Sequence, residues 1–335
     1  MSPTTSSSTA HWTSDAIHGG SLRRVDLDSG TNGWASPPGD LFLLRSSNYF
    51  TKRQKSPAGD YLLSPAGMDW LKSQSKLENV LSRADNRVGQ ALRQAQAQGK
   101  SLKSFIFAVN LQVPGKEHHS AVFYFSTDEP IPSGSLLSRF IEGDDAFRNQ
   151  RFKLVNRIVK GPWIVKKAVG NYSACLLGKA LTCNYHRGRN YFEIDVDIGS
   201  SAIANAILRL ALGYVTSVTI DMGFLVEAQD EEELPERLVG AVRVCQMEMS
   251  AATVVDAPNA PRGNKVNHLS GNDDRTWSGK VALKGNTFLL ARLEIKTAMH
   301  VVGHSLVDKL LASSSVNQAN PLPLTWFKDL RQKRL

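Results

Sequence analysis

Three carboxylates alternate along one short segment with high β propensity. Residues 191–198 (YFEIDVDI) place Glu193, Asp195 and Asp197 at every second position, with apolar side chains between them. Alternate side chains of a strand project to the same face, so the three acids share one face. Such a face could hold a divalent cation or supply an acid and a base for hydrolysis. An ordinary charged sheet face is the favoured interpretation, because a metal site needs several further converging oxygen atoms.

The segment before these acids predicts their partner strand. Residues 175–185 have strong β propensity and are joined to Tyr191 by the turn sequence HRGRN. If this turn closes a hairpin, Lys179 faces Asp197 across the two strands. We therefore expect a solvated ion pair and a structural role for the acids. A hydrolase that uses Asp195 and Asp197 is the less favoured alternative.

Basic and hydroxyl side chains gather in the same part of the chain. Lysines occur in the predicted strands and turns, two arginines occupy the HRGRN turn, and two serines precede a predicted helix at 200–212. A helix N-terminus and a basic sheet surface can each bind a phosphate or a lipid headgroup. The ordinary alternatives are helix capping and a solvated basic face. The candidate ligand-binding residues are Lys160, Lys166, Lys167, Lys179, Arg187, Arg189, Ser200 and Ser201.

The sequence contains no complete catalytic, cofactor or metal signature. It lacks GxSxG and a glycine-rich phosphate loop, and its three cysteines lack CxxC spacing. We expect these cysteines to be small buried residues in a reducing compartment. His300 and His304 have helical spacing, but the catalytic Glu of a zinc peptidase is missing between them. We therefore expect no catalytic residue, cofactor or metal.

The composition favours an anionic partner. The chain has 335 residues, a net charge of +9 and a pI of about 9.5. This charge suits an anionic lipid or membrane surface, while a protein partner is the alternative. Nucleic acid is unlikely, because no helix-turn-helix, zinc finger or RRM signature occurs. No run of ~20 apolar residues is present, so we expect no transmembrane helix. The cysteines suit a reducing compartment and no secretory signal is present, so we expect a cytoplasmic protein that can attach peripherally to membranes. The Ser/Thr-rich residues 1–24 leave a plastid transit peptide as an alternative.

The chemistry-bearing segments belong to a predicted α+β fold. Its main part is an antiparallel meander with strands at 152–159, 162–168, 175–185 and 191–198. A few helices pack on this predominantly antiparallel sheet. A curved sheet with the helix at 200–212 against it could enclose a cavity.

Composition divides the chain into four parts. Residues 1–33 are polar and predict a disordered tail. Residues 34–250 form the domain, and residues 251–285 are a linker rich in Pro, Asn, Gly and Asp. Residues 286–335 contain a predicted helix and a basic C-terminal tail.

Several segments in consistent order resemble a known plant and algal family. The segments include FLLRSSNY (42–49), DWLKS (69–73), SLLSRFIEGDDAF (135–147), ACLLGKALTCNY (174–185) and NYFEIDVDIGSS (190–201). Together they resemble the C-terminal domain of the enhanced disease resistance protein 2 family, over about residues 34–250.

The resemblance implies a regulatory function linked to lipids. In the best-known members this domain follows a pleckstrin-homology domain and a START lipid-transfer domain. Those proteins are implicated in phosphoinositide binding and in restraining defence-linked cell death. About 33 residues precede the domain here, so we do not expect binding by a pleckstrin-homology domain to carry over. We expect a non-enzymatic lipid- or membrane-associated module, or alternatively a protein-interaction scaffold without a lipid ligand.

Overall fold

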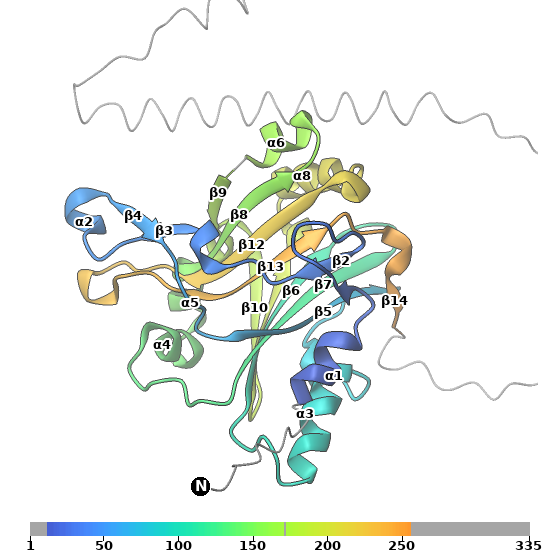
Figure 1. Ribbon diagram of the computed structural model, residues 1–335, viewed down its shortest axis with the longest axis horizontal. Helices are drawn as coiled ribbons and strands as arrows, with labels where there is room; N and C mark the ends of the chain where they lie inside the picture. The colour runs from blue at the N-terminus through green and yellow to red at the C-terminus, as the bar shows by residue number, and fades with distance from the viewer. Residues whose placement is uncertain (1–11, 171, 256–335) are drawn as a thin grey trace, which may run out of the picture. The chain divides into compact units, whose positions relative to one another are not determined.

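The computed structural model describes residues 12–170 and 172–255. These residues belong to the first of two compact units, which divide after Leu269. Figure 1 shows their strands and helices. Most of the predicted linker, the predicted helix with His300 and His304, and the basic C-terminal tail lie outside the described residues.

One six-stranded sheet contains the strands on either side of residues 161–171. Its strands are, in spatial order, β1 (Arg23–Arg24), β2 (Gly33–Ala35), β13 (Leu238–Cys245), β12 (Thr219–Val226), β8 (Phe152–Lys160) and β9 (Tyr172–Leu176). Strand β12 is antiparallel to both of its neighbours, β13 and β8. We call this the first sheet.

The second sheet also has six strands and carries the carboxylate segment. Its strands are, in spatial order, β10 (Thr182–Arg187), β11 (Tyr191–Asp197), β6 (Phe105–Val113), β7 (His118–Thr127), β5 (Ser64–Ser73) and β14 (Thr253–Val254). Strand β11 is parallel to β6, whereas β10–β11 and β6–β7 are antiparallel pairs. A separate two-stranded ribbon pairs β3 (Leu43–Arg45) with β4 (Lys55–Pro57).

Helices surround these sheets and connect them. The α-helices are α1 (Trp12–His18), α2 (Tyr49–Lys52), α3 (Arg87–Ala97), α4 (Leu136–Glu142), α5 (Asp145–Arg151), α6 (Trp163–Val169), α7 (Leu177–Ala180) and α8 (Ala202–Leu212). The 3-10 helices are η1 (Gly39–Leu41), η2 (Val80–Ser82), η3 (Ile198–Ser200), η4 (Val215–Ser217), η5 (Glu231–Glu233) and η6 (Met249–Ala251). Within the part of the chain that is described, no helix has the length and apolar character needed to cross a bilayer.

The two sheets pack face to face around an aromatic core. Phe123 and Phe125 of the second sheet contact Phe224 of the first, with ring centroids 5.6 and 6.0 Å apart. The opposite face of the second sheet is covered by α1, α3 and η2, where Val88 and Leu92 of α3 are buried. Because β6 is covered on both faces, its sequence is almost continuously apolar. The α+β class and the mostly sheet content are confirmed.

The prediction of a disordered tail is wrong for residues 12–33. Trp12 and Ala16 of α1 lie in the cluster beneath α3, and Leu22 is fully buried in the core between the sheets. These side chains are isolated among Ser, Thr and Gly, so they leave no periodic signal. They are ordered because the rest of the domain provides the surface that buries them.

The predicted meander is wrong in its connections. The segment predicted as strand 162–168 is helix α6, which Pro162 precedes and Gly170, at φ 90°, ends. The segment predicted as strand 175–185 is interrupted by α7, which carries the chain from the first sheet to the second. Its β-branched and apolar residues suggested continuous strands, but packing between the sheets decides their conformation.

Candidate functional site

The carboxylate face of β11 is buried. Glu193 and Asp195 are 0% and 1% exposed, and they lie on the face of the second sheet that η2 covers. Glu193 accepts hydrogen bonds from the backbone N–H groups of Val80 (2.6 Å) and Leu81 (2.7 Å). The predicted alternation of the strand is therefore confirmed. The ordinary charged face expected for these acids is buried, because residues 77–82 fold over it.

Asp195 is the centre of a polar network within this buried layer. It accepts hydrogen bonds from the backbone N–H of Asn79 and the side-chain amide of Asn110, both at 2.9 Å. His186 Nε2 lies 2.9 Å from the same carboxylate. Burial, together with the neighbouring Asp195 charge, raises the pKa of Glu193 well above its ordinary value. A buried carboxylate bonded to backbone amides in this way is an internal structural group and has no open position for a substrate.

The register of the hairpin differs from the prediction. Asp197 lies opposite Thr182, not Lys179, because α7 removes Lys179 from the strand. The partner of Asp197 is instead Lys76, whose Nζ lies 2.6 Å from Oδ2. Lys179 is exposed on α7.

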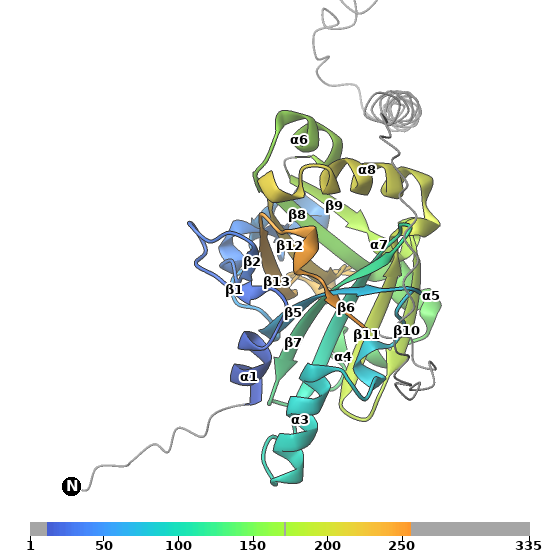
Figure 2. The same ribbon diagram turned by 90° about the vertical axis from the view of Figure 1, so that its right-hand side faces the viewer.

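Two helices beside the first sheet expose apolar surface. Helices α6 and α8 contact each other, and Figures 1 and 2 both place them at the end of the domain away from α3. Nine of the eleven residues of α8 are apolar, yet none is buried. Trp163 of α6 is 72% exposed and Ile203 of α8 is 41% exposed. Trp163, Ile203 and Tyr214, which follows α8, are three of the seven exposed large apolar side chains of the described residues.

The two helical segments of this face carry only positive charges. Residues 161–170 and 198–218 contain no Asp or Glu. Lys166 and Lys167 lie on α6 and Arg209 lies on α8. Lys160 is close in sequence at the end of β8, where its Nζ donates to the backbone oxygen of Asp28 at 3.2 Å. The structure thus keeps Lys160, Lys166 and Lys167 in one region and adds Arg209, which the sequence analysis did not select. We call α6, α8 and the residues that join them to the sheets the α6–α8 face.

The two candidate serines have internal partners. Ser201 is the N-cap of α8 and accepts from the backbone N–H of Ala204 at 3.3 Å. Ser200 accepts from the backbone N–H of Thr182 and donates to the backbone oxygen of Asp197. The predicted capping is therefore confirmed. These hydroxyls fix the start of α8 rather than standing free for a ligand.

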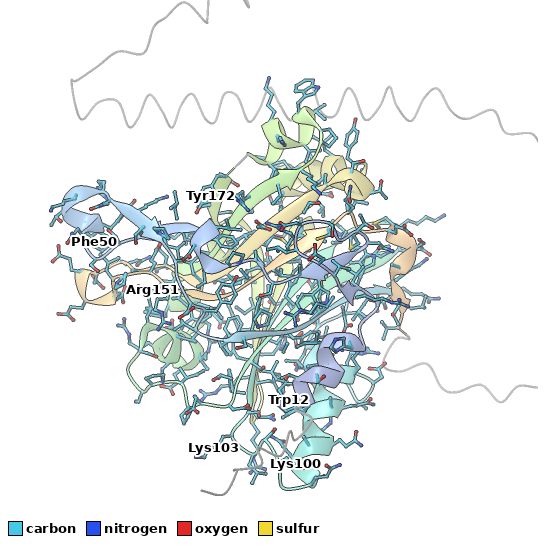
Figure 3. All side chains as sticks on the ribbon, viewed as in Figure 1. Trp12, Phe50, Lys100, Lys103, Arg151 and Tyr172 are labelled. Atoms are coloured by element: carbon cyan, nitrogen blue, oxygen red, sulfur yellow. The ribbon has the colours of Figure 1, made fainter. Side chains whose placement is uncertain are left out.

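The HRGRN turn lies at the opposite end of the domain. Figures 1 and 2 place the β10–β11 turn away from α6. There Arg187 and Arg189 line a hollow of about 280 Å³ together with Lys103, which Figure 3 labels near Lys100. Phe105 contributes apolar surface to the same hollow. The predicted basic residues therefore form two separate groups, and we call this second group with its cavity the basic hollow.

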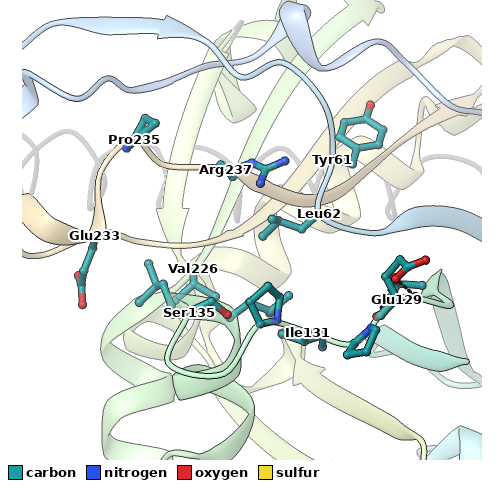
Figure 4. Close-up of a pocket in the computed structure, with 14 residues that line it drawn as sticks. Tyr61, Leu62, Glu129, Ile131, Ser135, Val226, Glu233, Pro235 and Arg237 are labelled. Carbon is teal, nitrogen blue, oxygen red and sulfur yellow. Dashed lines mark hydrogen bonds between the residues drawn. The ribbon is translucent and has the colours of Figure 1, made fainter. Parts of the chain in front are cut away.

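A larger groove adjoins the basic hollow. Its volume is about 410 Å³. Figure 4 shows Leu62 and Arg237 on one side and Val226 and Ile131 on the other. No residue of α8 lines it, so this groove is not the cavity predicted beneath the helix at 200–212. Its lining consists of Tyr61, Leu62, Thr127, Glu129, Pro130, Ile131, Pro132, Ser135, Leu136, Leu137, Val226, Glu233, Pro235 and Arg237.

Some of the charged side chains that line this groove form ion pairs within the domain, and others do not. Burial alone would raise the pKa of Glu233, but hydrogen bonds from Gln229, Arg151 and Arg139 lower it. The Glu233 carboxylate is therefore ionised and compensated internally. Arg237 is exposed and forms no ion pair within the described ranges. Among the described residues, the charges of the groove that lack an ion-pair partner are therefore Arg237 and Glu129.

We next consider whether the described residues could bind a metal ion or supply a reactive cysteine. No cluster of three His, Cys, Asp or Glu side chains in them could hold a metal ion. The three cysteines are free. Cys245 is buried as predicted, but Cys175 is exposed, because it lies on the edge strand β9 of the first sheet. Burial raises the pKa of the Cys183 thiol to about 12, which disfavours the reactive thiolate.

Sequence comparison identifies the family of the chain. The model of a family described as Protein ENHANCED DISEASE RESISTANCE 2, C-terminal, matches residues 34–248. The chain belongs to this family. A protein of Arabidopsis thaliana, "Protein ENHANCED DISEASE RESISTANCE 2-like", is 46% identical over 235 residues. The match covers 70% of this chain but only 31% of that relative, so the chain spans less than a third of its length.

The family match and the structure have different N-terminal limits. The enhanced disease resistance 2 C-terminal match begins at residue 34. The folded unit begins earlier, since Trp12, Ala16 and Leu22 are core residues. In this chain the family domain is therefore completed by a segment that precedes the matched region.

Proposed function

We propose that the chain is a non-enzymatic regulatory module of the enhanced disease resistance 2 family that binds anionic membrane surfaces. The observation that carries the proposal is the α6–α8 face. It combines exposed Trp163, Ile203 and Tyr214 with Lys166 and Lys167, and its two segments contain no acid. The face can therefore bind a membrane both by insertion of apolar side chains and by electrostatic attraction to anionic headgroups.

Both attractions have a known physical basis. Tryptophan and tyrosine rings favour the interface between headgroups and acyl chains. Each Lys or Arg near an anionic leaflet contributes about 1 kcal/mol. A single weak membrane-binding contribution gives only reversible attachment. Stable binding therefore depends on apolar and basic groups acting together. Trp163 and its neighbouring lysines on α6 meet that requirement.

Flotation with liposomes tests the proposal. The full chain is mixed with vesicles of phosphatidylcholine alone or of phosphatidylcholine with phosphatidylserine. The variants are Trp163→Ala and the double variant Lys166→Glu/Lys167→Glu. A matched control, Lys52→Glu/Lys55→Glu, makes the same charge change at two exposed lysines near the β3–β4 ribbon.

We expect the wild type and the control to float with the anionic vesicles only. Reversal of Lys166 and Lys167 should reduce the bound fraction about tenfold or more, given about 1 kcal/mol per basic residue. Trp163→Ala should weaken binding at high salt, where the electrostatic contribution is screened. Equal recovery of wild type and the Lys166→Glu/Lys167→Glu variant would overturn the proposal. Absence of flotation at low salt would do the same and favour a protein partner for the α6–α8 face.

The regulatory part of the proposal comes from the family. The printed name of the Arabidopsis thaliana relative refers to disease resistance. We propose that this chain acts in a related defence pathway, at the cytoplasmic face of a membrane. In plants that lack the related protein, the wild-type chain should restore the normal response, while the Lys166→Glu/Lys167→Glu variant should not. Equal rescue by both would separate the regulatory role from membrane binding.

A further inference from the structure

The groove and the basic hollow adjoin each other. Glu129, Pro130 and Ile131 line both, so one short loop separates them. Helix α4 also borders both, with Leu137 on the groove and Ile141 on the hollow. The two cavities are therefore compartments of one site, remote from the α6–α8 face in both views of the fold.

We propose that this joint site binds a single-chain anionic amphiphile, with the aliphatic chain in the groove and the anionic head beside Arg187 and Arg189. The groove volume of about 410 Å³ falls within the range of about 300–1,000 Å³ that is typical of small-molecule sites. Leu62, Ile131 and Val226 give it the apolar lining that a hydrocarbon chain needs. The inference goes beyond the proposed membrane binding, because it uses no residue of α6 or α8.

The charged side chains of the basic hollow favour a negatively charged head group on the ligand. Lys103, Arg187 and Arg189 have no ion-pair partner within residues 12–170 and 172–255. Glu129 and Glu142 also line the hollow, so three cations face two carboxylates. Guanidinium groups bind carboxylates and phosphates with two parallel hydrogen bonds. A carboxylate or phosphate head is therefore favoured on the side of the arginines, and the two acids oppose it.

Four ligands separate the contributions of the chain and the head. Dodecyl phosphate and dodecanoate share the chain and differ in the anion, which distinguishes a phospholipid-like head from a fatty-acid head. Dodecanol keeps the chain and removes the charge, and inorganic phosphate keeps the charge and removes the chain. Isothermal titration of the full-length chain, below the micelle concentration of each ligand, measures the affinities. We expect at least one dodecyl anion to bind about tenfold more tightly than dodecanol, because two partly solvated charge contacts supply that difference. Inorganic phosphate should show no binding.

Substitutions that remove positive charge or negative charge from the basic hollow test where the head group of the ligand binds. Arg187→Glu/Arg189→Glu should remove the preference for the anion. Glu142→Gln should instead strengthen binding of the anion a few fold, since it removes an opposing charge from the hollow. All three residues are exposed, so these substitutions are not expected to unfold the domain. Loss of the anion preference in Arg237→Glu but not in Arg187→Glu/Arg189→Glu would overturn this placement.

A bulky side chain tests the placement of the hydrocarbon. Ile131→Trp should weaken all three dodecyl ligands, because residue 131 borders both cavities. Ser133→Trp is the matched control, since Ser133 is an exposed residue of the same loop and lines neither cavity. Failure of every dodecyl ligand to bind, or equal binding by Ile131→Trp and the wild type, would overturn the inference. Lys166→Glu/Lys167→Glu should bind the ligands normally, so this result does not depend on membrane binding by α6.

Discussion

Arg243 and Asp221 form a two-point ion pair inside the first sheet. Arg243 Nε lies 2.5 Å from Asp221 Oδ1, and Nη2 lies 2.9 Å from Oδ2. The two residues are register partners on β13 and β12, and Arg157 of β8 donates to the same carboxylate at 2.7 Å. One acid thus links the three central strands through side chains.

Substitution of Asp221 should destabilise the fold strongly. Asp221 is 0% exposed and Arg243 is 4% exposed, so Asp221→Asn leaves a buried guanidinium without its counterion. Breaking such a pair lowers the free energy of unfolding by about 3–5 kcal/mol. Urea denaturation followed by circular dichroism measures this change. Asp28→Asn is the control, because Asp28 is an exposed acid 3.9 Å from Arg243. A change equal to that of the control would contradict the structural role of Asp221.

Glu193 should make the stability fall as the pH rises. Its pKa is raised in the folded state by burial and by Asp195, so the folded state binds more protons than the unfolded state above the ordinary pKa of a Glu. The free energy of unfolding then decreases with pH by up to about 1.4 kcal/mol per unit, until the pH passes the folded-state pKa. Below the ordinary pKa this dependence disappears.

Denaturation of wild type and Glu193→Gln from pH 5 upward measures this contribution. The slope of unfolding free energy against pH should become less negative in the variant, whatever the change in absolute stability. Glu248→Gln, at an exposed position, serves as the control. Parallel curves for wild type and Glu193→Gln would show that Glu193 titrates alike in both states.

The N-terminal segment should be required for full stability. Leu22 is 0% exposed and belongs to the core between the sheets. Leu22→Ala should lower the free energy of unfolding by about 2–5 kcal/mol, from lost burial and the cavity left behind. Ser14→Ala, on the exposed side of α1, is the control. Thermal unfolding compares the two, and equal melting temperatures would show that residues before the family match do not support the core.

The N-cap of α8 should contribute to the order of the α6–α8 face. Ser201→Ala removes the hydrogen bond to the N–H of Ala204 and should destabilise the helix by about 1 kcal/mol. No residue of α8 is fully buried, and Leu208 and Leu212 pack only partly against the core, so the cap should matter to the order of the helix. Amide hydrogen exchange should therefore become faster in α8 and remain unchanged in β12. Exchange that is unaltered in α8 would contradict the capping role.

The local features of the fold were well predicted from sequence. Alternating side chains predicted the strand at 191–198. The cap Ser201 follows from the hydroxyl residues at the start of the predicted helix. These features depend on neighbours in the chain, which a sequence displays directly.

The candidate site was predicted only in part because its residues meet through long-range packing. Arg187 and Arg189 were recognised from their turn sequence. Lys103 lines the basic hollow with them, and Arg237 lines the adjoining groove, but both come from distant parts of the sequence. Glu193 was expected on an ordinary charged face. Its burial could not be predicted, because the residues that cover it, Val80 and Leu81, lie more than 100 residues earlier. The alternation of residues 191–198 does not indicate which other segment of the chain covers that strand.

The parallel pairing of β11 with β6 has a consequence for the order in which the domain assembles. The hairpins β6–β7 and β10–β11 each join residues close in sequence, so both can form early. Their union requires Tyr191 to meet Ile106, across about 85 residues, and closing so long a loop is slow. The carboxylates of Glu193 and Asp195 remain hydrated until that step, and they lose water only when residues 77–82 cover them. We therefore expect the docking of the two hairpins to limit the folding rate of the second sheet.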